Sequence, residues 1–368
     1  MKTSRSSSVP VAVVGTGNVG KQLLLRLIDR PPFSVIAVCN LEGSVINTGG
    51  FSAKEIRRFL YNDQLDSFDG AQSHKTADQI GNELAAANNN RPVIVADVTA
   101  DDLGQEHLSW LELGFRVATA NKKPVTDTQW LWNKLMAFGP SRYRFECTCG
   151  AGLPVISSIR DLLAVGDEIL NIRAAASGSL GYIMSACEGH HPLLQQDIGQ
   201  AILDAKWNGY TEPDPRDDLS CMDLARKALI LARLIGHELE LQDIDVQNLV
   251  PPSLGKLPLE QFTKRLKEGR GLGSLQAEFN AARSKHQKPR CLFELSHCDN
   301  NNWFGIKVGF RTLSPVDPIA GLSYAENLFV IQSNLYDGLK LKIGGPGAGG
   351  GVTAAGVLAD MLHLADKM

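Results

Sequence analysis

The sequence predicts an α/β protein with two domains, the first containing a doubly wound parallel sheet and the second of α+β type. Three observations lead to this prediction. An apolar run at residues 9–14 ends in the turn GTGNVG, which leads into a helical pattern. Further short apolar runs follow and end in polar residues. Beyond residue 290, β-type runs are separated by turn residues, which favours antiparallel strands.

The composition is that of an ordinary globular protein. The chain has 368 residues, of which 43% are hydrophobic and 21% charged, and its formal net charge of −3 gives no reason to expect a nucleic-acid partner. It contains no run of about 18 apolar residues, so we expect no membrane span. The start, Met1–Ser8, lacks the apolar segment of a signal peptide, and the seven cysteines suit a reducing compartment. We therefore expect a cytoplasmic protein.

The turn after the first apolar run predicts a site for a dinucleotide. In such a turn Gly15 makes the tight bend, Gly17 lets the backbone approach the pyrophosphate, and Gly20 lets the helix pack close to the strand. The phosphates then lie at the helix N-terminus, where free N–H groups favour an anion. The first domain is therefore expected to be of Rossmann type. The residues expected to bind the cofactor in this turn are Gly15, Thr16, Gly17, Asn18, Val19 and Gly20.

The end of the second apolar run, at residues 33–39, leaves the choice between NAD and NADP open. An acid usually stands here to bind the ribose hydroxyls, but position 40 is Asn40 and the nearest acid, Glu42, comes two residues later. No Arg or Lys follows at once to hold a 2′-phosphate. We therefore expect Asn40 to contact the cofactor without deciding which one.

Two later runs also end in polar residues. Residues 93–96 lead to Thr99, and residues 117–119 lead to Asn121, Lys122 and Lys123. Ligands in open α/β sheets bind at the carboxyl ends of strands, so these residues are expected to point toward the cofactor. The alternative for the two lysines is that they are solvated loop residues. A last strand of the first domain is expected at 143–147.

The segment Gly209–Lys227 combines five acids with two prolines. Its prolines predict a stiff turn that carries Glu212, and Asp217 or Asp218 is expected to cap a helix running to about residue 236. On that helix Asp223 and Lys227 are four residues apart and share a face. These charges could form a pocket for a small zwitterion, or they could be a solvated surface pair.

Two more glycine-rich stretches precede helical patterns. The first, at 150–156, is either a functional turn or a tight domain connection. The second, Gly344–Gly351, has six glycines in eight residues and leads into a helix that is expected to return to the first domain; the alternative is a flexible tail with a docking helix. The expected division is residues 1–155, with 1–8 as a flexible tail, then a substrate and dimerisation domain at 156–343 and the returning segment at 344–368.

These motifs occur together in one order, and with them the chain resembles the homoserine dehydrogenase family. The motifs are GTGNVG, ANKKP, ECTCGAGLPVI, SGSLGYI, GYTEPDPRDDLSCMDLARK and GPGAGGGVTAAGVLADML. The resemblance runs from about residue 10 to the end and implies the short, monofunctional form. It also implies a homodimer that interconverts L-homoserine and L-aspartate 4-semialdehyde with NAD or NADP.

The resemblance also implies roles for single residues. It implies Lys227 as the catalytic acid/base, with Glu212 and Asp223 binding the substrate. A cation at that position would stabilise the negative charge that develops on the aldehyde oxygen and supply its proton. Lys122 is implied to be catalytic and near both substrate and cofactor, and Thr99 to be near the nicotinamide.

Two further sites are implied. Gly347 would belong to a loop that closes over the cofactor. A monovalent cation, usually sodium, would be held by Glu146 and by the backbone carbonyls of Cys149, Ala151 and Leu153. Cys149 stands where the family usually has a Val-like residue, which does not matter if only its carbonyl binds. The end at Asn40 differs from the Ser-Arg type common in NADP-preferring members.

Two other functions are consistent with parts of the sequence. A phosphorylating semialdehyde dehydrogenase would need a nucleophilic cysteine with a histidine base, and Cys147, Cys149 and Cys187 are candidates by location alone. A sensor that binds NAD(P) without turnover would keep the fold, but the joint presence of Glu212, Asp223 and Lys227 argues against it.

Overall fold

The computed structural model describes residues 8–28, 30–41, 43–68, 72–73, 77–188, 197–298, 303–324 and 326–368. Glu42, the late acid after the second strand, lies outside these ranges. The chain forms two compact units, one made of Met1–Gly152 with Gly349–Met368 and the other of Leu153–Ala348. No helix in the described ranges has both the length and the apolar character needed to cross a membrane.

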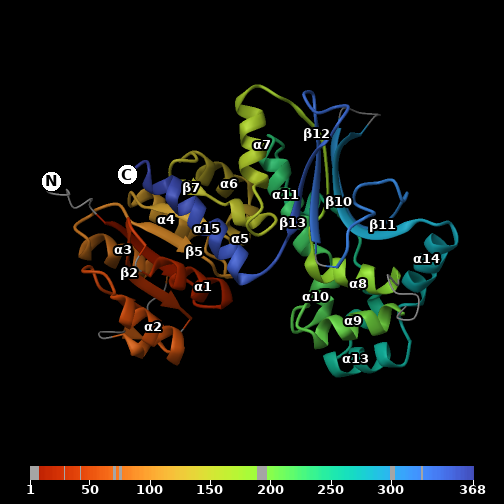
Figure 1. Ribbon diagram of the computed structural model, residues 1–368, viewed down its shortest axis with the longest axis horizontal. Helices are drawn as coiled ribbons and strands as arrows, with labels where there is room; N and C mark the ends of the chain where they lie inside the picture. Colours follow the sequence, from red (N-terminus) through yellow and green to blue (C-terminus); the bar gives the residue numbers. More distant parts are fainter. Residues whose placement is uncertain are drawn as a thin grey trace. The chain divides into compact units, whose positions relative to one another are not determined.

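The first unit is an open, twisted α/β sheet (Figure 1). Its strand order is β4-β3-β2-β1-β5-β6-β7; β2, β1, β5, β6 and β7 run parallel, and β3 and β4 form an antiparallel edge. The order reverses beside β1, which creates the crevice where such sheets bind ligands. The elements are β1 (Val9–Val14), α1 (Asn18–Leu27), β2 (Phe33–Asn40), β3 (Gly43–Ile46), α2 (Ala53–Asn62), β4 (Gln72–Ser73), α3 (Ala77–Ala87), β5 (Ile94–Asp97), α4 (Gly104–Glu112), β6 (Arg116–Thr119), α5 (Lys123–Thr126), α6 (Gln129–Met136), β7 (Tyr143–Arg144) and α15 (Gly350–Ala365).

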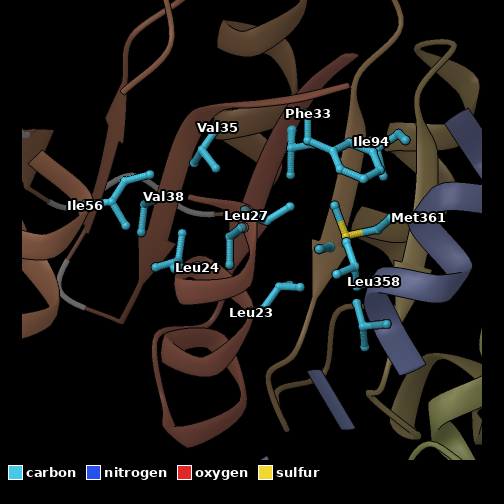
Figure 2. Close-up of a cluster of buried hydrophobic side chains, with 14 of the residues drawn as sticks. Leu23, Leu24, Leu27, Phe33, Val35, Val38, Ile56, Ile94, Leu358 and Met361 are labelled. Carbon is cyan, nitrogen blue, oxygen red and sulfur yellow. The ribbon is translucent and has the colours of Figure 1, made fainter. Parts of the chain in front are cut away.

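The C-terminal helix α15 packs against α1 in the first unit, as predicted (Figure 1). Figure 2 shows Leu358 and Met361 of α15 beside Leu23 of α1 and Ile94 of β5 in one buried cluster. Burying each such side chain contributes roughly 1.5–3 kcal/mol. The last 16-residue helix is therefore part of the core of this unit.

The second unit is α+β, as predicted, with a six-stranded sheet in the order β13-β12-β8-β10-β11-β9. All pairs are antiparallel except β11 with β9. The elements are α7 (Val155–Ala164), β8 (Ile169–Ala175), α8 (Gly178–Glu188), α9 (Ile198–Trp207), α10 (Pro215–Leu219), α11 (Met222–Leu234), β9 (Asp245–Val246), α12 (Pro252–Gly255), α13 (Leu259–Lys267), α14 (Gly273–Ser284), β10 (Lys288–Cys298), β11 (Trp303–Leu313), β12 (Glu326–Ser333) and β13 (Leu341–Pro346).

The single helix expected from Asp217 or Asp218 to residue 236 is wrong. Asp214 is the cap instead, because its Oδ1 accepts a hydrogen bond from Arg216 N at 3.0 Å and Pro215 occupies the first helical position, where no N–H is needed. The short α10 ends at Leu219, and the left-handed residue Cys221, with φ of 61°, separates it from α11. Asp217 and Asp218 therefore lie on α10 and Asp223 on α11, with a bend between the two helices.

The strand expected at 143–147 is also too long. Only Tyr143–Arg144 pairs with β6, and Glu146–Thr148 forms a 3-10 turn. Glu146 N donates to the Asp360 carboxylate of α15 at 3.0 Å, so the chain leaves the sheet to meet this helix.

Candidate active site

The turn Gly15–Gly20 has the geometry that a bound dinucleotide requires. Gly15 has φ of 101°, and a Cβ there would lie 2.9 Å from Thr99 Cγ2. A Cβ on Gly20 would lie 2.0 Å from the Gly15 carbonyl oxygen, so the helix can approach the turn only with glycine there. A Cβ added to Gly17 would have no neighbouring atom of the described residues within 4 Å. The N-terminus of α1 also has no side-chain cap. An open space at an uncapped helix start fits a pyrophosphate.

The rest of the turn is held by the Asn40 side chain of β2 and by close contact with the start of α15. Asn40 Nδ2 donates to Thr16 Oγ1 at 3.3 Å, and Asn40 Oδ1 accepts from Gly43 N at 3.2 Å. Asn18 lies against Gly350, where a Cβ would come within 2.6 Å of its Oδ1. Val19 packs on the hydrophobic cluster of this unit.

Thr99 and the Asn121–Lys122 segment lie together at the carboxyl ends of β5 and β6. Asn121 Nδ2 donates to Thr99 Oγ1 at 3.2 Å, and Lys122 directly precedes α5, where its carbonyl accepts from Thr126 Oγ1 at 2.9 Å. These residues and the glycine turn are therefore on one edge of the same sheet.

Lys227 is the centre of a polar cluster in the second unit. The residue is only 7% exposed. Its Nζ donates to the Ala176 carbonyl at the end of β8 at 2.6 Å and forms an ion pair with Asp223 Oδ2 at 2.8 Å. The Asp223 side chain is about half exposed, at 49%. This arrangement is not the solvated surface pair considered above, because the lysine is buried and has a second partner, the backbone carbonyl of the residue that follows β8.

Asp218, which the sequence did not single out as a site residue, joins this cluster to the turn that carries Glu212. Its Oδ1 accepts from Ser179 Oγ at 2.6 Å and its Oδ2 from Glu212 N at 2.9 Å. Burial raises the pKa of the Asp218 carboxyl, and the nearby Asp223 charge acts in the same direction. The exposed Glu212 side chain is thus carried on a turn whose backbone is tied to α8 and α10. The sequence signal for this contact is Ser-Gly-Ser at residues 177–179, which directly follows an expected strand.

Gly347 follows β13 in the second unit and lies against Asn327 of β12. A Cβ on Gly347 would come within 1.7 Å of Asn327 Nδ2, so no other residue fits there without rearrangement. Asn327 is fully buried, and within the described residues its amide atoms have no hydrogen-bond partner.

The residues expected to hold a cation lie after β7. Gly150 and Ala151 are both left-handed, with φ of 76° and 56°. Glu146 and Cys149 are in the same turn, and Leu153 is the first residue of the second unit. Within the described ranges, no group of three or more His, Cys, Asp or Glu side chains could hold a metal ion, so a cation here would depend on carbonyl oxygens.

The buried cysteines do not have the properties of a catalytic nucleophile. Burial raises the pKa of the Cys147 thiol well above its ordinary value and that of Cys187 to about 12. Cys149 is also fully buried. A thiol with a raised pKa is a poor source of thiolate, so a phosphorylating dehydrogenase that uses cysteine is not favoured. Cys187 instead lines a cavity of about 330 Å³ between α8, α14 and β10, which contains none of the expected site residues.

A dinucleotide turn in one unit and a buried lysine among carboxylates in the other define the class of an NAD(P)-dependent oxidoreductase. The family model for homoserine dehydrogenase matches residues 154–362. The homoserine dehydrogenase of Schizosaccharomyces pombe is 30% identical over 100% of this chain and 98% of its own length. A bifunctional aspartokinase/homoserine dehydrogenase of Zea mays is 32% identical over 98% of this chain, which spans 39% of that protein.

Solved structures agree with this result. A Candida auris protein of unknown function superposes with a TM-score of 0.84 at 30% identity, covering 98% of this chain and 99% of its own. A hyperthermophilic archaeal homoserine dehydrogenase in complex with NADPH has the same fold, with a TM-score of 0.73 at 22% identity and 98% coverage of both chains. The chain belongs to the homoserine dehydrogenase family. It is an NAD(P)-dependent oxidoreductase that acts on a CH–OH group.

Proposed function

We propose that Lys227 is the general acid/base with which this member of the family interconverts L-homoserine and L-aspartate 4-semialdehyde. The observation that carries the proposal is the position of Lys227 Nζ, which is buried and held by the Ala176 carbonyl and the Asp223 carboxylate at 2.6 and 2.8 Å. Two fixed acceptors orient the ammonium group before substrate arrives. Preorganised charge of this kind does not have to reorient during the reaction.

In the proposed mechanism the protein manages the proton and the substrate. When bound, NAD(P)H supplies the hydride that reduces the aldehyde, and the oxidised cofactor accepts it in the reverse reaction. Lys227 Nζ donates its proton to the C4 oxygen as negative charge develops there, which completes the alcohol. In the reverse direction the neutral Lys227 amine takes the hydroxyl proton. The ion pair with Asp223 at 2.8 Å holds the ammonium group in place.

Glu212 is proposed to bind the substrate ammonium group. Its side chain is exposed, while its backbone N–H is held by Asp218 Oδ2 at 2.9 Å, so the carboxylate starts from a fixed turn. A charge-assisted hydrogen bond from an ammonium group to such a carboxylate is about twice as strong as a neutral one. Lys122 is proposed as a second catalytic cation near both substrate and cofactor.

For the cofactor, we propose binding by the turn Gly15–Gly20 together with Asn40, Thr99, Lys122 and Gly347. NADPH is the proposed choice because Asn40 carries no charge that would repel a 2′-phosphate, and because the archaeal relative was solved with NADPH. A monovalent cation, sodium, is proposed at Glu146 and the carbonyls of Cys149, Ala151 and Leu153. The consecutive left-handed residues Gly150 and Ala151 support this, since strained turns of this kind occur mainly at functional sites.

A homodimer and a cytoplasmic location are also proposed. Six free, buried cysteines in the described part of the chain suit a reducing compartment. Light scattering on the purified protein tests the dimer.

The test of the function is a spectrophotometric assay of NAD(P)H formation with L-homoserine, run with NAD and with NADP in turn. We expect turnover with at least one cofactor and a higher kcat/KM with NADP. Addition of sodium and its replacement by a large organic cation test the cation site. A protein that binds cofactor but shows no turnover with homoserine would favour the sensor function instead.

A further inference from the structure

A buried hydrogen-bond network lies behind the cofactor edge of the first unit, and its central group is the Asp97 carboxylate at the end of β5. Asp97 is completely buried. Its Oδ1 accepts from Thr99 N at 2.9 Å and from Thr99 Oγ1 at 2.8 Å. Its Oδ2 accepts from Asn121 Nδ2 at 3.0 Å and lies 2.9 Å from His107 Nε2. Thr119 Oγ1 also donates to Oδ2, at 3.4 Å. Oδ1 therefore has two partners and Oδ2 has three.

The far side of the network fixes the carboxylate from within the core. His107 of α4 is fully buried, and its Nδ1 lies 2.9 Å from the hydroxyl of Tyr143 on β7. One tautomer satisfies both contacts, with Nε2–H donating to Asp97 and Nδ1 accepting from the Tyr143 hydroxyl. Although Asp97 is buried, the His107 and Thr99 hydrogen bonds lower the pKa of its carboxyl. The carboxylate is therefore charged at neutral pH and cannot turn freely.

The near side of the network reaches the residues that are proposed to contact the cofactor. Thr99 is in contact with the first glycine of the turn, since a Cβ on Gly15 would lie 3.1 Å from Thr99 N. Asn121 Nδ2 donates to Asp97, and Asn121 Oδ1 accepts from Lys123 N at 3.1 Å, which fixes the backbone on both sides of Lys122. A displacement of Asp97 would move both Thr99 and the Asn121–Lys123 segment.

We propose that Asp97 is a positioning residue for cofactor binding, which His107 and Tyr143 lock in place so that it sets Thr99 and the Asn121–Lys123 segment against the glycine turn. Asp97 and His107 are fully buried and are therefore not catalytic groups themselves. The proposal rests on the proposed cofactor site. Burial of a charge costs free energy, and it is tolerated only when the hydrogen bonds of the charged group are complete. The proposed role explains why this domain contains a buried carboxylate despite that cost.

The test measures the Kd of NADPH by fluorescence, without substrate, for wild type and for Asp97→Asn. In either orientation of the new amide, its NH2 group faces a donor that cannot accept, Asn121 Nδ2 on one side or Thr99 N on the other, so at least one hydrogen bond of the network is lost. We expect the Kd to rise about tenfold or more, as loss of hydrogen bonds to a charged group predicts. His107→Phe keeps a ring of similar size but cannot donate, and we expect a smaller rise of about three- to tenfold. It serves as the second variant if Asp97→Asn does not fold.

If Asp97 only stabilised the fold, its substitution would lower the melting temperature without a specific effect on the Kd of NADPH. Two controls distinguish this structural role from the proposed positioning role. Ser67→Ala removes a buried hydroxyl of the same unit that accepts from Asn62 Nδ2 at 3.1 Å and is not part of the Asp97 network. It should lower the melting temperature while its Kd stays at the wild-type value. The second control is a double-mutant cycle with Thr99→Val: if Asp97 acts through Thr99, the double variant should bind NADPH about as weakly as Asp97→Asn alone.

The proposal is overturned if folded Asp97→Asn and His107→Phe bind NADPH as wild type does, or if the Asp97 and Thr99 effects are additive. Failure of the wild type itself to bind NADPH or NADH would instead overturn the proposed cofactor site. The two failures are therefore distinguishable from the same set of titrations.

Discussion

The glycine turn of the first unit is made of backbone, whereas the Lys227 cluster of the second unit is made of side chains. In the turn, Gly15 and Gly20 allow close approach of main-chain atoms, and the groups proposed to bind the ligand are N–H donors of one short segment. In the cluster, Lys227, Asp218 and Ser179 come from α11, α10 and α8, and a carbonyl at the end of β8 completes the set. A site made of backbone depends on local sequence, and a site made of side chains depends on how helices pack. The two sites should therefore fail in different ways when they are altered.

The largest expected effect comes from Lys227→Ala. Loss of the proton donor should lower kcat by roughly 10²-fold or more, the usual size of a general-acid contribution. The Kd of NADPH should remain close to wild type, because the cofactor turn is in the other unit. Stopped-flow or steady-state turnover combined with a fluorescence titration measures both. Lys256→Ala, at an exposed lysine of the same unit, is the matched control and should leave kcat unchanged. Turnover near the wild-type value in Lys227→Ala would remove this residue from the mechanism.

Two alanine substitutions in the glycine turn test the site made of backbone. Gly20→Ala should destabilise the free protein by about 1–3 kcal/mol, because the new Cβ overlaps the Gly15 carbonyl oxygen. Gly17→Ala has open space around it and φ of −67°, so the free protein should keep its melting temperature. The same methyl group would occupy the space proposed for the pyrophosphate, and the Kd of NADPH should rise about tenfold.

These two glycine variants are each other's control. In thermal unfolding without ligand, Gly20→Ala should show the larger loss of stability. In the NADPH titration, Gly17→Ala should show the larger rise in Kd. If Gly17→Ala lowered the melting temperature as much as Gly20→Ala, the space beside Gly17 would not be a ligand space.

The sequence predicted the backbone site in more detail than the side-chain site. GTGNVG, the apolar runs around it and the C-terminal helix follow from local patterns, and the sheet and α15 have the predicted arrangement. From residue spacing, the Lys227 cluster was predicted as an Asp223–Lys227 face beside a stiff turn with Glu212, with Asp217 or Asp218 as a helix cap; the roles of these residues came from the family resemblance. Asp218 turned out to bridge α8 and the Glu212 turn, which no spacing rule could indicate because Ser179 is 39 residues away in the chain. The Asp97–His107–Tyr143 network was missed for the same reason, since these residues meet only when α4 packs on the sheet.

Glu212→Gln should have a smaller effect than Lys227→Ala, and it should affect only substrate binding. Removal of the carboxylate charge should raise the KM for L-homoserine about tenfold, because a charge-assisted contact to the substrate ammonium group becomes a neutral one. The Kd of NADPH and the melting temperature should not change, since the side chain is exposed and the turn is held by its backbone. Glu260→Gln, at an exposed glutamate of α13, is the matched control. An unchanged KM for homoserine would exclude Glu212 from the substrate site.

The smallest expected effect is a change in cofactor preference from Asn40→Asp. Asn40 ends β2 with its amide nitrogen on Thr16 Oγ1 and its oxygen on Gly43 N, so an aspartate of the same size keeps the second contact. A carboxylate at this position can accept from a ribose 2′-hydroxyl but repels a 2′-phosphate. We expect the ratio of kcat/KM for NADP to that for NAD to fall roughly three- to tenfold, with kcat for NAD unchanged, as one weak charge contact predicts. Leu41→Ala, at the exposed neighbour, should leave the ratio as it is. A ratio that stays constant in Asn40→Asp would place the 2′-phosphate away from the end of β2, and the backbone turn alone would then define the cofactor site.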